Sequence, residues 1–133
     1  MKYKSTRGTA PVLDFAGVTL AGLASDGGLY VPESWPQVSR DEIAALAGLA
    51  EAETAARILA KFTGDVLDES ELLDLCKQAY GRFAHDAVTP LVQLDQRHWL
   101  LELFHGPTLA FKDVALQLVG LLFERFIGDR KLT

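Results

Sequence analysis

The sequence contains a single cysteine, Cys76, among 133 residues. One cysteine cannot form a disulfide within its own chain, and such low usage is typical of proteins from reducing compartments. Cys76 lies beside leucines at helical spacing, so core packing is its expected role. The first five residues are polar and β-like, unlike a secretory signal. Together these features predict a cytoplasmic protein.

The sequence also has no cluster of lysine or arginine. The formal net charge is −5, and the basic residues are dispersed apart from the pair Arg130-Lys131. Because nucleic-acid-binding proteins concentrate positive charge on one face, this composition argues against nucleic acid as a partner. The longest apolar run, residues 114–123, is interrupted by Gln117 and is too short to span a bilayer. We therefore expect neither a nucleic-acid partner nor a membrane partner.

Metal-ligand spacing is absent too, because the histidines at 85, 98 and 105 share no suitable interval with cysteine or carboxylates. Two roles are open for His105, beside Gly106: a general base, or a residue that packs or bonds the backbone at a turn. Two roles are also open for Ser5 and Thr6, which precede Arg7-Gly8. They could face a phosphorylated ligand or cap a turn.

What the sequence does contain is 49% hydrophobic and 23% charged residues, which is typical of a globular chain with enough apolar side chains for a core. Capping residues precede three apolar runs. Asp14 can cap one helix, and the segments 39–42 and 68–71 have the Ser/Asp-x-x-Glu pattern of a helix start. The amino-terminal elements predicted from these signals are helices from 15 to before Ser25, over 43–49, 51–62 and 69–83, and strands at 2–5 and 29–32.

A different pattern begins at Val88. Residues 91–94 and 98–104 are typical of two strands joined by a tight turn, and an apolar helix is predicted over 114–127. Gln117 and Glu124, seven positions apart, give this helix only a narrow polar stripe. A helix that is apolar around most of its surface must be buried over most of it. The other predicted elements look insufficient to cover it, so we expect the natural chain to continue beyond Thr133.

The junction before that helix, residues 103–113, reads Leu-Phe-His-Gly-Pro-Thr-Leu-Ala-Phe-Lys-Asp. An amine at a helix start, such as that of Lys112, feels the positive end of the helix dipole, and apolar neighbours would partly desolvate it. Both effects disfavour the ammonium form and favour a nucleophile suited to Schiff bases. Asp113 opposes them, since a nearby carboxylate favours the charged amine. From these residues alone, a solvated surface lysine stays the more common interpretation.

Three motifs in this order resemble threonine synthase: Tyr-Lys-Ser-Thr-Arg-Gly at 3–8, Leu-Ala-Gly-Leu-Ala-Ser-Asp-Gly-Gly-Leu-Tyr-Val-Pro at 20–32, and Glu-Leu-Phe-His-Gly-Pro-Thr-Leu-Ala-Phe-Lys-Asp at 102–113. The resemblance runs from the first residues to the last, but family members are much longer. It implies an amino-terminal portion of a pyridoxal 5'-phosphate enzyme, of the fold type shared with serine dehydratases and tryptophan synthase β subunits. Such an enzyme converts O-phospho-L-homoserine and water to L-threonine and phosphate.

The resemblance also implies roles for three residues. Lys112 matches the lysine that forms the Schiff base with the cofactor and moves protons, Phe111 matches an aromatic that packs on the cofactor ring, and Thr108 would approach the substrate. The glycine-rich phosphate loop and the group facing the pyridine nitrogen belong to later sequence. The 133-residue chain alone is therefore expected to bind cofactor poorly and to be inactive.

The expected fold class is α/β, with a helical amino-terminal domain over 1–86 and the incomplete beginning of a sheet-and-helix pyridoxal-phosphate domain over 87–133. The remainder of its own chain is the expected partner, and the exposed apolar helix predicts self-association. Two alternatives stay open: another pyridoxal-phosphate lyase of the same fold type, and a non-catalytic assembly module related to the amino-terminal domain.

Overall fold

The structure, a computed structural model, describes residues 1–130, so Lys131 of the basic pair lies outside the described residues. Strands β1 (Tyr3–Ser5) and β2 (Tyr30–Pro32) pair antiparallel, with Tyr3 opposite Pro32. Between them lies α1 (Phe15–Ala21). Asp14 caps it as predicted, because its side chain accepts a hydrogen bond from Gly17 N at 2.8 Å. The helix ends earlier than expected, at Gly22, which has φ +66°.

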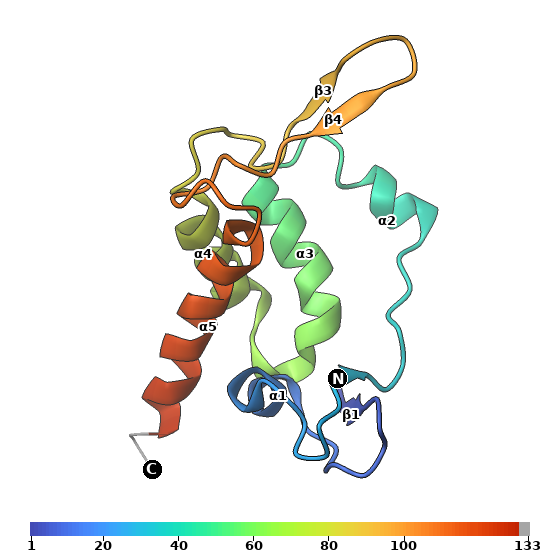
Figure 1. Cartoon of the computed structure of the whole chain (residues 1–133), viewed down its shortest axis with the longest axis vertical. Coiled ribbons are helices and arrows are strands. Elements are labelled where there is room, and N and C mark those ends of the chain that lie inside the picture. The colour runs from blue at the N-terminus through green and yellow to red at the C-terminus, as the bar shows by residue number, and fades with distance from the viewer. Residues whose placement is uncertain (131–133) are drawn as a thin grey trace.

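Three helices form the core. Helices α3 (Glu51–Thr63) and α4 (Glu69–Tyr80) are joined by the 3-10 turn η1 (Gly64–Val66), and α4 also packs against α5 (Asp113–Arg130). Figure 1 shows these three helices gathered together, with α1 across one end. The Phe15 and Phe126 rings meet edge to face at 6.1 Å, which joins α1 to α5. The core side chains are Ala56, Leu67, Leu72, Cys76, Ala79, Leu118, Leu122 and Phe126.

The core confirms the expected role of Cys76, and its burial raises the pKa of the thiol to about 11. Asp68 caps α4 by accepting from Glu71 N at 2.8 Å, as its capping signature predicts. Core residues come from both sides of position 86, because α5 packs against α4. The division into units 1–86 and 87–133 stays a prediction.

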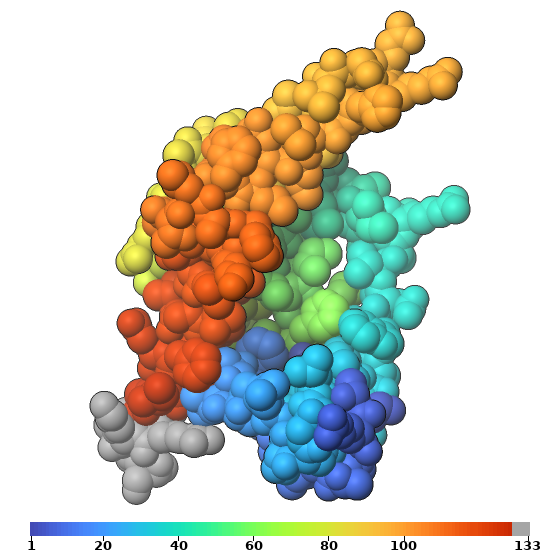
Figure 2. All heavy atoms as spheres, in the orientation of Figure 1, coloured from blue at the N-terminus to red at the C-terminus, as the bar shows by residue number. Residues whose placement is uncertain are grey.

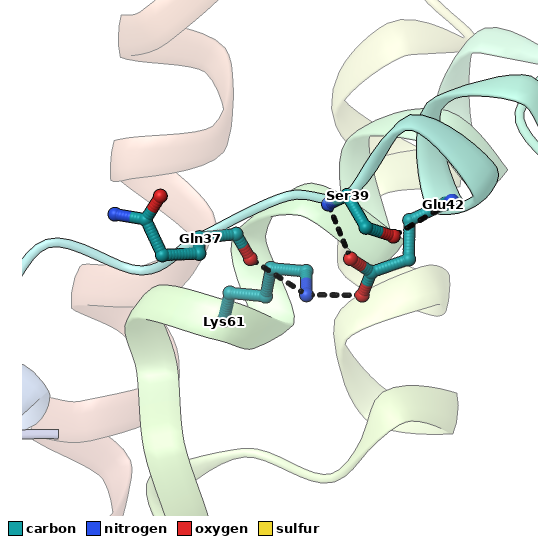
Figure 3. Close-up of polar contacts among 4 residues, drawn as sticks. All are labelled: Gln37, Ser39, Glu42 and Lys61. Carbon is teal, nitrogen blue, oxygen red and sulfur yellow. Dashed lines mark hydrogen bonds and ion pairs between the residues drawn. The ribbon is translucent and has the colours of Figure 1, made fainter.

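Helix α2 (Arg40–Ala44) stands apart from the core and is tied to α3 by a polar network (Figure 3). The predicted capping box is confirmed: Glu42 N donates to Ser39 Oγ at 3.1 Å, and Ser39 N donates to Glu42 Oε2 at 2.7 Å. Lys61 Nζ of α3 donates to Glu42 Oε1 at 2.5 Å and to the Gln37 carbonyl at 3.2 Å. The predicted end at Leu49 was wrong, because single turns follow Ala44 in place of further helix.

This network predicts an acid-dependent change near α2. The hydrogen bond from Lys61, and then those from Ser39, lower the pKa of Glu42 from 4.5 to about 2. Because the folded pKa is depressed, the contact stabilises the fold above about pH 4.5 and is lost as the pH falls toward 2. We expect an NMR titration of the Glu42 carboxyl to show this low midpoint, and Lys61→Met to move it up. An ordinary midpoint in the unaltered chain would contradict the contact.

The second sheet is a hairpin of β3 (Leu91–Gln93) and β4 (Trp99–Leu101), with Leu91 opposite Leu101. Figure 2 shows it projecting from the body of the molecule, at the upper right. The predicted hairpin is confirmed, although both strands are shorter than expected. Apolar side chains are exposed along both strands: Leu91, Val92, Trp99, Leu100 and Leu101.

Helix α5 is only partly covered, as its apolar sequence predicts. Leu118, Leu122 and Phe126 are buried, whereas Leu116 is 55% exposed and Ile127 is also exposed. The exposed apolar side chains of α5 therefore lie outside the core of the described chain. None of the helices in the described chain is long and apolar enough to cross a membrane.

Candidate functional site

The candidate site is the segment between β4 and α5, which ends in Lys112. Lys112 occupies the last position before α5, and its carbonyl accepts from Ala115 N at 3.1 Å and from Leu116 N at 2.8 Å. The predicted placement of this lysine at a helix start is therefore confirmed. The positive end of the α5 dipole therefore lies at the backbone of Lys112.

The predicted desolvation of Lys112 was wrong for this chain. The Lys112 side chain is exposed, and so are its neighbours Phe111 (65%) and Leu109. The physical reason is that α5 and the loop before it are covered on one side only. An exposed amine beside an exposed aromatic ring can be reached by a planar ligand from the open side.

Asp113 is buried, with only 3% of the residue exposed, and its carboxylate is bonded within the loop and helix. Its Oδ2 accepts from Thr108 N at 2.7 Å, and its Oδ1 accepts from Thr108 Oγ1 at 2.9 Å and from Gln117 Nε2 at 3.3 Å. No ion pair joins it to Lys112 in the described part of the chain. In place of an ion pair, the carboxylate is bonded to Thr108 in the loop and to Gln117 of α5.

Burial alone raises the pKa of Asp113, but the hydrogen bonds from Thr108 and Gln117 outweigh it and hold the pKa below its ordinary value. The carboxylate is therefore charged at neutral pH. Thr108 Oγ1 donates its only proton to this carboxylate, so toward any ligand it can still accept a hydrogen bond but cannot donate one.

For His105, the geometry supports the packing role. Its Nε2 lies 2.6 Å from Glu102 Oε2, its ring lies 5.2 Å from that of His85, and its carbonyl accepts from Ala84 N at 2.8 Å. These contacts anchor the loop to the segment that follows α4. The ring contact with His85 and the bond from Ala84 N are packing and backbone contacts, as the second role requires.

The Ser5-Thr6 segment is a capped turn. Ser5 Oγ donates to Asp26 Oδ1 at 2.7 Å, and Thr6 Oγ1 accepts from Leu29 N at 3.0 Å. Asp26 also accepts from the backbone N–H groups of Thr9, Ala10 and Gly28. The bond from Ser5, with those backbone bonds, holds the pKa of Asp26 well below its usual range. The sequence did not predict that Asp26 holds this turn together, although an aspartate before Gly-Gly is a turn signal.

The described chain also has hollows that Lys112 does not line. One of about 300 Å³ lies between α2 and α3, with Val38, Leu46 and Ile58 among its lining residues. Within residues 1–130, no group of three or more histidine, cysteine or acidic side chains could hold a metal ion.

Solved structures share this fold. A pyridoxal-phosphate-bound threonine synthase from Brucella melitensis matches 98% of the chain with a TM-score of 0.95 and 50% identity. The threonine synthase from yeast matches 99% with a TM-score of 0.91 and 40% identity. The chain covers 28% and 27% of those two chains. The fold is thus the mixed α/β, mostly helical type found in the amino-terminal region of these enzymes.

Sequence comparison identifies the family. The family model for the threonine synthase N terminus matches residues 2–80. Curated threonine synthases from Pseudomonas aeruginosa and Saccharomyces cerevisiae are 52% and 42% identical, over 98% and 94% of the chain. The chain belongs to the threonine synthase family, as its three motifs predict. It spans 28% and 26% of the length of these two relatives.

Proposed function

We propose that this chain is the amino-terminal part of a threonine synthase that converts O-phospho-L-homoserine and water to L-threonine and phosphate. The observation that carries this proposal is the accessible amine of Lys112 at the start of α5, within a family whose Brucella member binds pyridoxal phosphate. No comparable observation supports the two alternatives, a non-catalytic assembly module and another pyridoxal-phosphate lyase of the same fold type.

The residues present fit the aldehyde and the ring of pyridoxal phosphate, but not its phosphate group. Lys112 would hold it through its amine and then carry protons during the reaction, and the exposed Phe111 ring would lie against the cofactor ring. Thr108 would accept a hydrogen bond from the substrate. When bound, pyridoxal phosphate withdraws electrons from the carbon that loses a proton.

The phosphate group of the cofactor needs several backbone N–H donors, and the Thr108 N–H is already bonded to Asp113. Those donors would come from the remaining length that the relatives have. The exposed hairpin and the uncovered side of α5 are suited to pack against that part. We infer that the 133-residue chain alone binds cofactor weakly, self-associates through these surfaces, lacks activity, and functions in the cytoplasm as part of the longer enzyme.

A graft tests the proposal. The part of this chain that aligns with the Pseudomonas aeruginosa enzyme, over 130 residues at 52% identity, would replace the matching segment of that enzyme. We expect the graft to release phosphate from O-phospho-L-homoserine at a rate within about tenfold of the parent, because two segments that are 52% identical should hold the reacting groups in the same place.

The graft has two informative controls. The parent enzyme sets the full rate, and the parent lacking the aligned segment sets the background. A folded, cofactor-containing graft with only background phosphate release would contradict the proposal and favour the assembly module. Strong turnover by the 133-residue chain alone would contradict the expected need for the remaining length.

A further inference from the structure

Asp113 differs from an ordinary acidic residue at a helix start. An ordinary cap accepts hydrogen bonds from the first N–H groups of its own helix. The Asp113 carboxylate instead accepts the N–H and the hydroxyl of Thr108, five residues earlier, at 2.7 and 2.9 Å. These bonds therefore fix the path of the loop relative to the helix.

Two backbone hydrogen bonds within residues 106–113 also hold the loop closed. Leu109 N donates to the Gly106 carbonyl at 3.1 Å, and Asp113 N donates to the Ala110 carbonyl at 3.0 Å. Leu109 has φ +60°, a conformation that residues other than glycine rarely adopt and that the surrounding bonds must hold. The loop is thus a small ring, closed by the Asp113 carboxylate.

Lys112 and Phe111 lie on the outward side of this ring. Residues 111 and 112 are exposed, whereas 113 is buried, so exposure changes abruptly between Lys112 and the carboxylate that closes the ring. Gln117, one helical turn later, donates to the same carboxylate at 3.3 Å and holds it against the helix. The direction in which the lysine leaves the backbone depends on this anchored carboxylate.

We propose that Asp113 is a positioning residue, whose bonds to Thr108 direct the Lys112 amine toward the open side where the cofactor aldehyde must approach. This inference rests on the proposed function, because it concerns the same lysine. Nucleophilic attack requires the amine in a near-attack position, and a misplacement of about 1 Å can slow a step about a hundredfold.

The test begins with the 133-residue chain itself. Amide hydrogen exchange at Thr108 N reports whether the ring is closed. Asp113→Ala should speed this exchange about tenfold, because it removes the acceptor of that N–H. Asp113→Asn retains an acceptor oxygen and should stay near the unaltered chain.

The second measurement uses the graft without bound cofactor. Pyridoxal phosphate is added, the adduct is trapped with borohydride, and its rate of formation is measured at each lysine by mass spectrometry. Asp113→Ala should slow the adduct at Lys112 about tenfold, with Asp113→Asn close to the parent. Lys77, exposed on α4, is the internal control, because a general loss of structure would change its rate together with that of Lys112.

The outcomes separate the two proposals. An unchanged Lys112 rate in Asp113→Ala, with a normal adduct in the unaltered graft, overturns the positioning role and leaves the proposed function standing. Equal changes at Lys112 and Lys77 also overturn it, because they indicate a purely structural residue. No adduct at Lys112 in the unaltered graft overturns the proposed function, and the positioning role with it.

Discussion

Replacing Lys112 by alanine in the graft is expected to lower phosphate release from O-phospho-L-homoserine at least about a thousandfold. The amine would be both the covalent attachment of the cofactor and the group that carries protons, so its removal eliminates two roles at once. Folding should be little affected, because the Lys112 side chain is exposed. The measurement is steady-state phosphate release, together with borohydride trapping of bound cofactor.

Lys77→Ala is the matched control, since Lys77 is another exposed lysine of a helix that packs against α5. It should keep full activity and the Lys112 adduct. Lys112→Arg keeps the positive charge but not the nucleophilic amine, so it should be as inactive as Lys112→Ala. Activity within tenfold of the graft for either Lys112 variant would exclude this lysine as the cofactor attachment.

The local parts of the fold could be predicted from the sequence. A helix cap is a contact between residues three apart, so Asp14, Ser39 and Asp68 were each identified before any tertiary information. The end of α2 could not be predicted in the same way. The helix ends at Ala44 and single turns follow it, although apolar residues continue to Leu49.

In the candidate site, too, the local features could be predicted and the tertiary contacts could not. The sequence placed Lys112 correctly at a helix start, because a Gly-Pro turn before an apolar run marks that boundary. It did not reveal that Asp113 would bond Thr108, since an acidic residue beside a lysine has several possible partners. It also overstated the desolvation of the amine, because burial depends on whatever covers the loop from outside.

The apolar surface of α5 was predicted for a physical reason that the structure confirms. A helix with so few polar positions needs partners on most sides, and Leu116 and Ile127 are exposed among the described residues. The exposure of Leu91 and Trp99 on the hairpin, by contrast, is a finding of the structure that the strand pattern did not predict. The scarcity of polar positions therefore located the surface of α5 that other protein would cover, although it could not identify the partner.

Gly106→Ala should impair the site more than loss of the Asp113 carboxylate does. A Cβ at position 106 would lie 2.4 Å from Asp113 Cβ and 2.5 Å from Asp113 Oδ2. The Asp113 Cβ is fixed to the helix backbone, so the loop itself must move away. Such overpacking typically lowers the free energy of unfolding by about 1–3 kcal/mol.

The same displacement would open the ring that orients Lys112, so we expect the Lys112 adduct in the graft to form about a hundredfold more slowly. Gly120→Ala is the matched control on α5, because its Cβ would meet nothing within 4 Å. That variant should raise helix stability by about 0.5–1 kcal/mol and leave the adduct rate unchanged. Denaturant unfolding and adduct kinetics measure both variants. If Gly106→Ala matched Gly120→Ala in both measurements, the close contact between the loop and Asp113 would not control the orientation of the Lys112 amine.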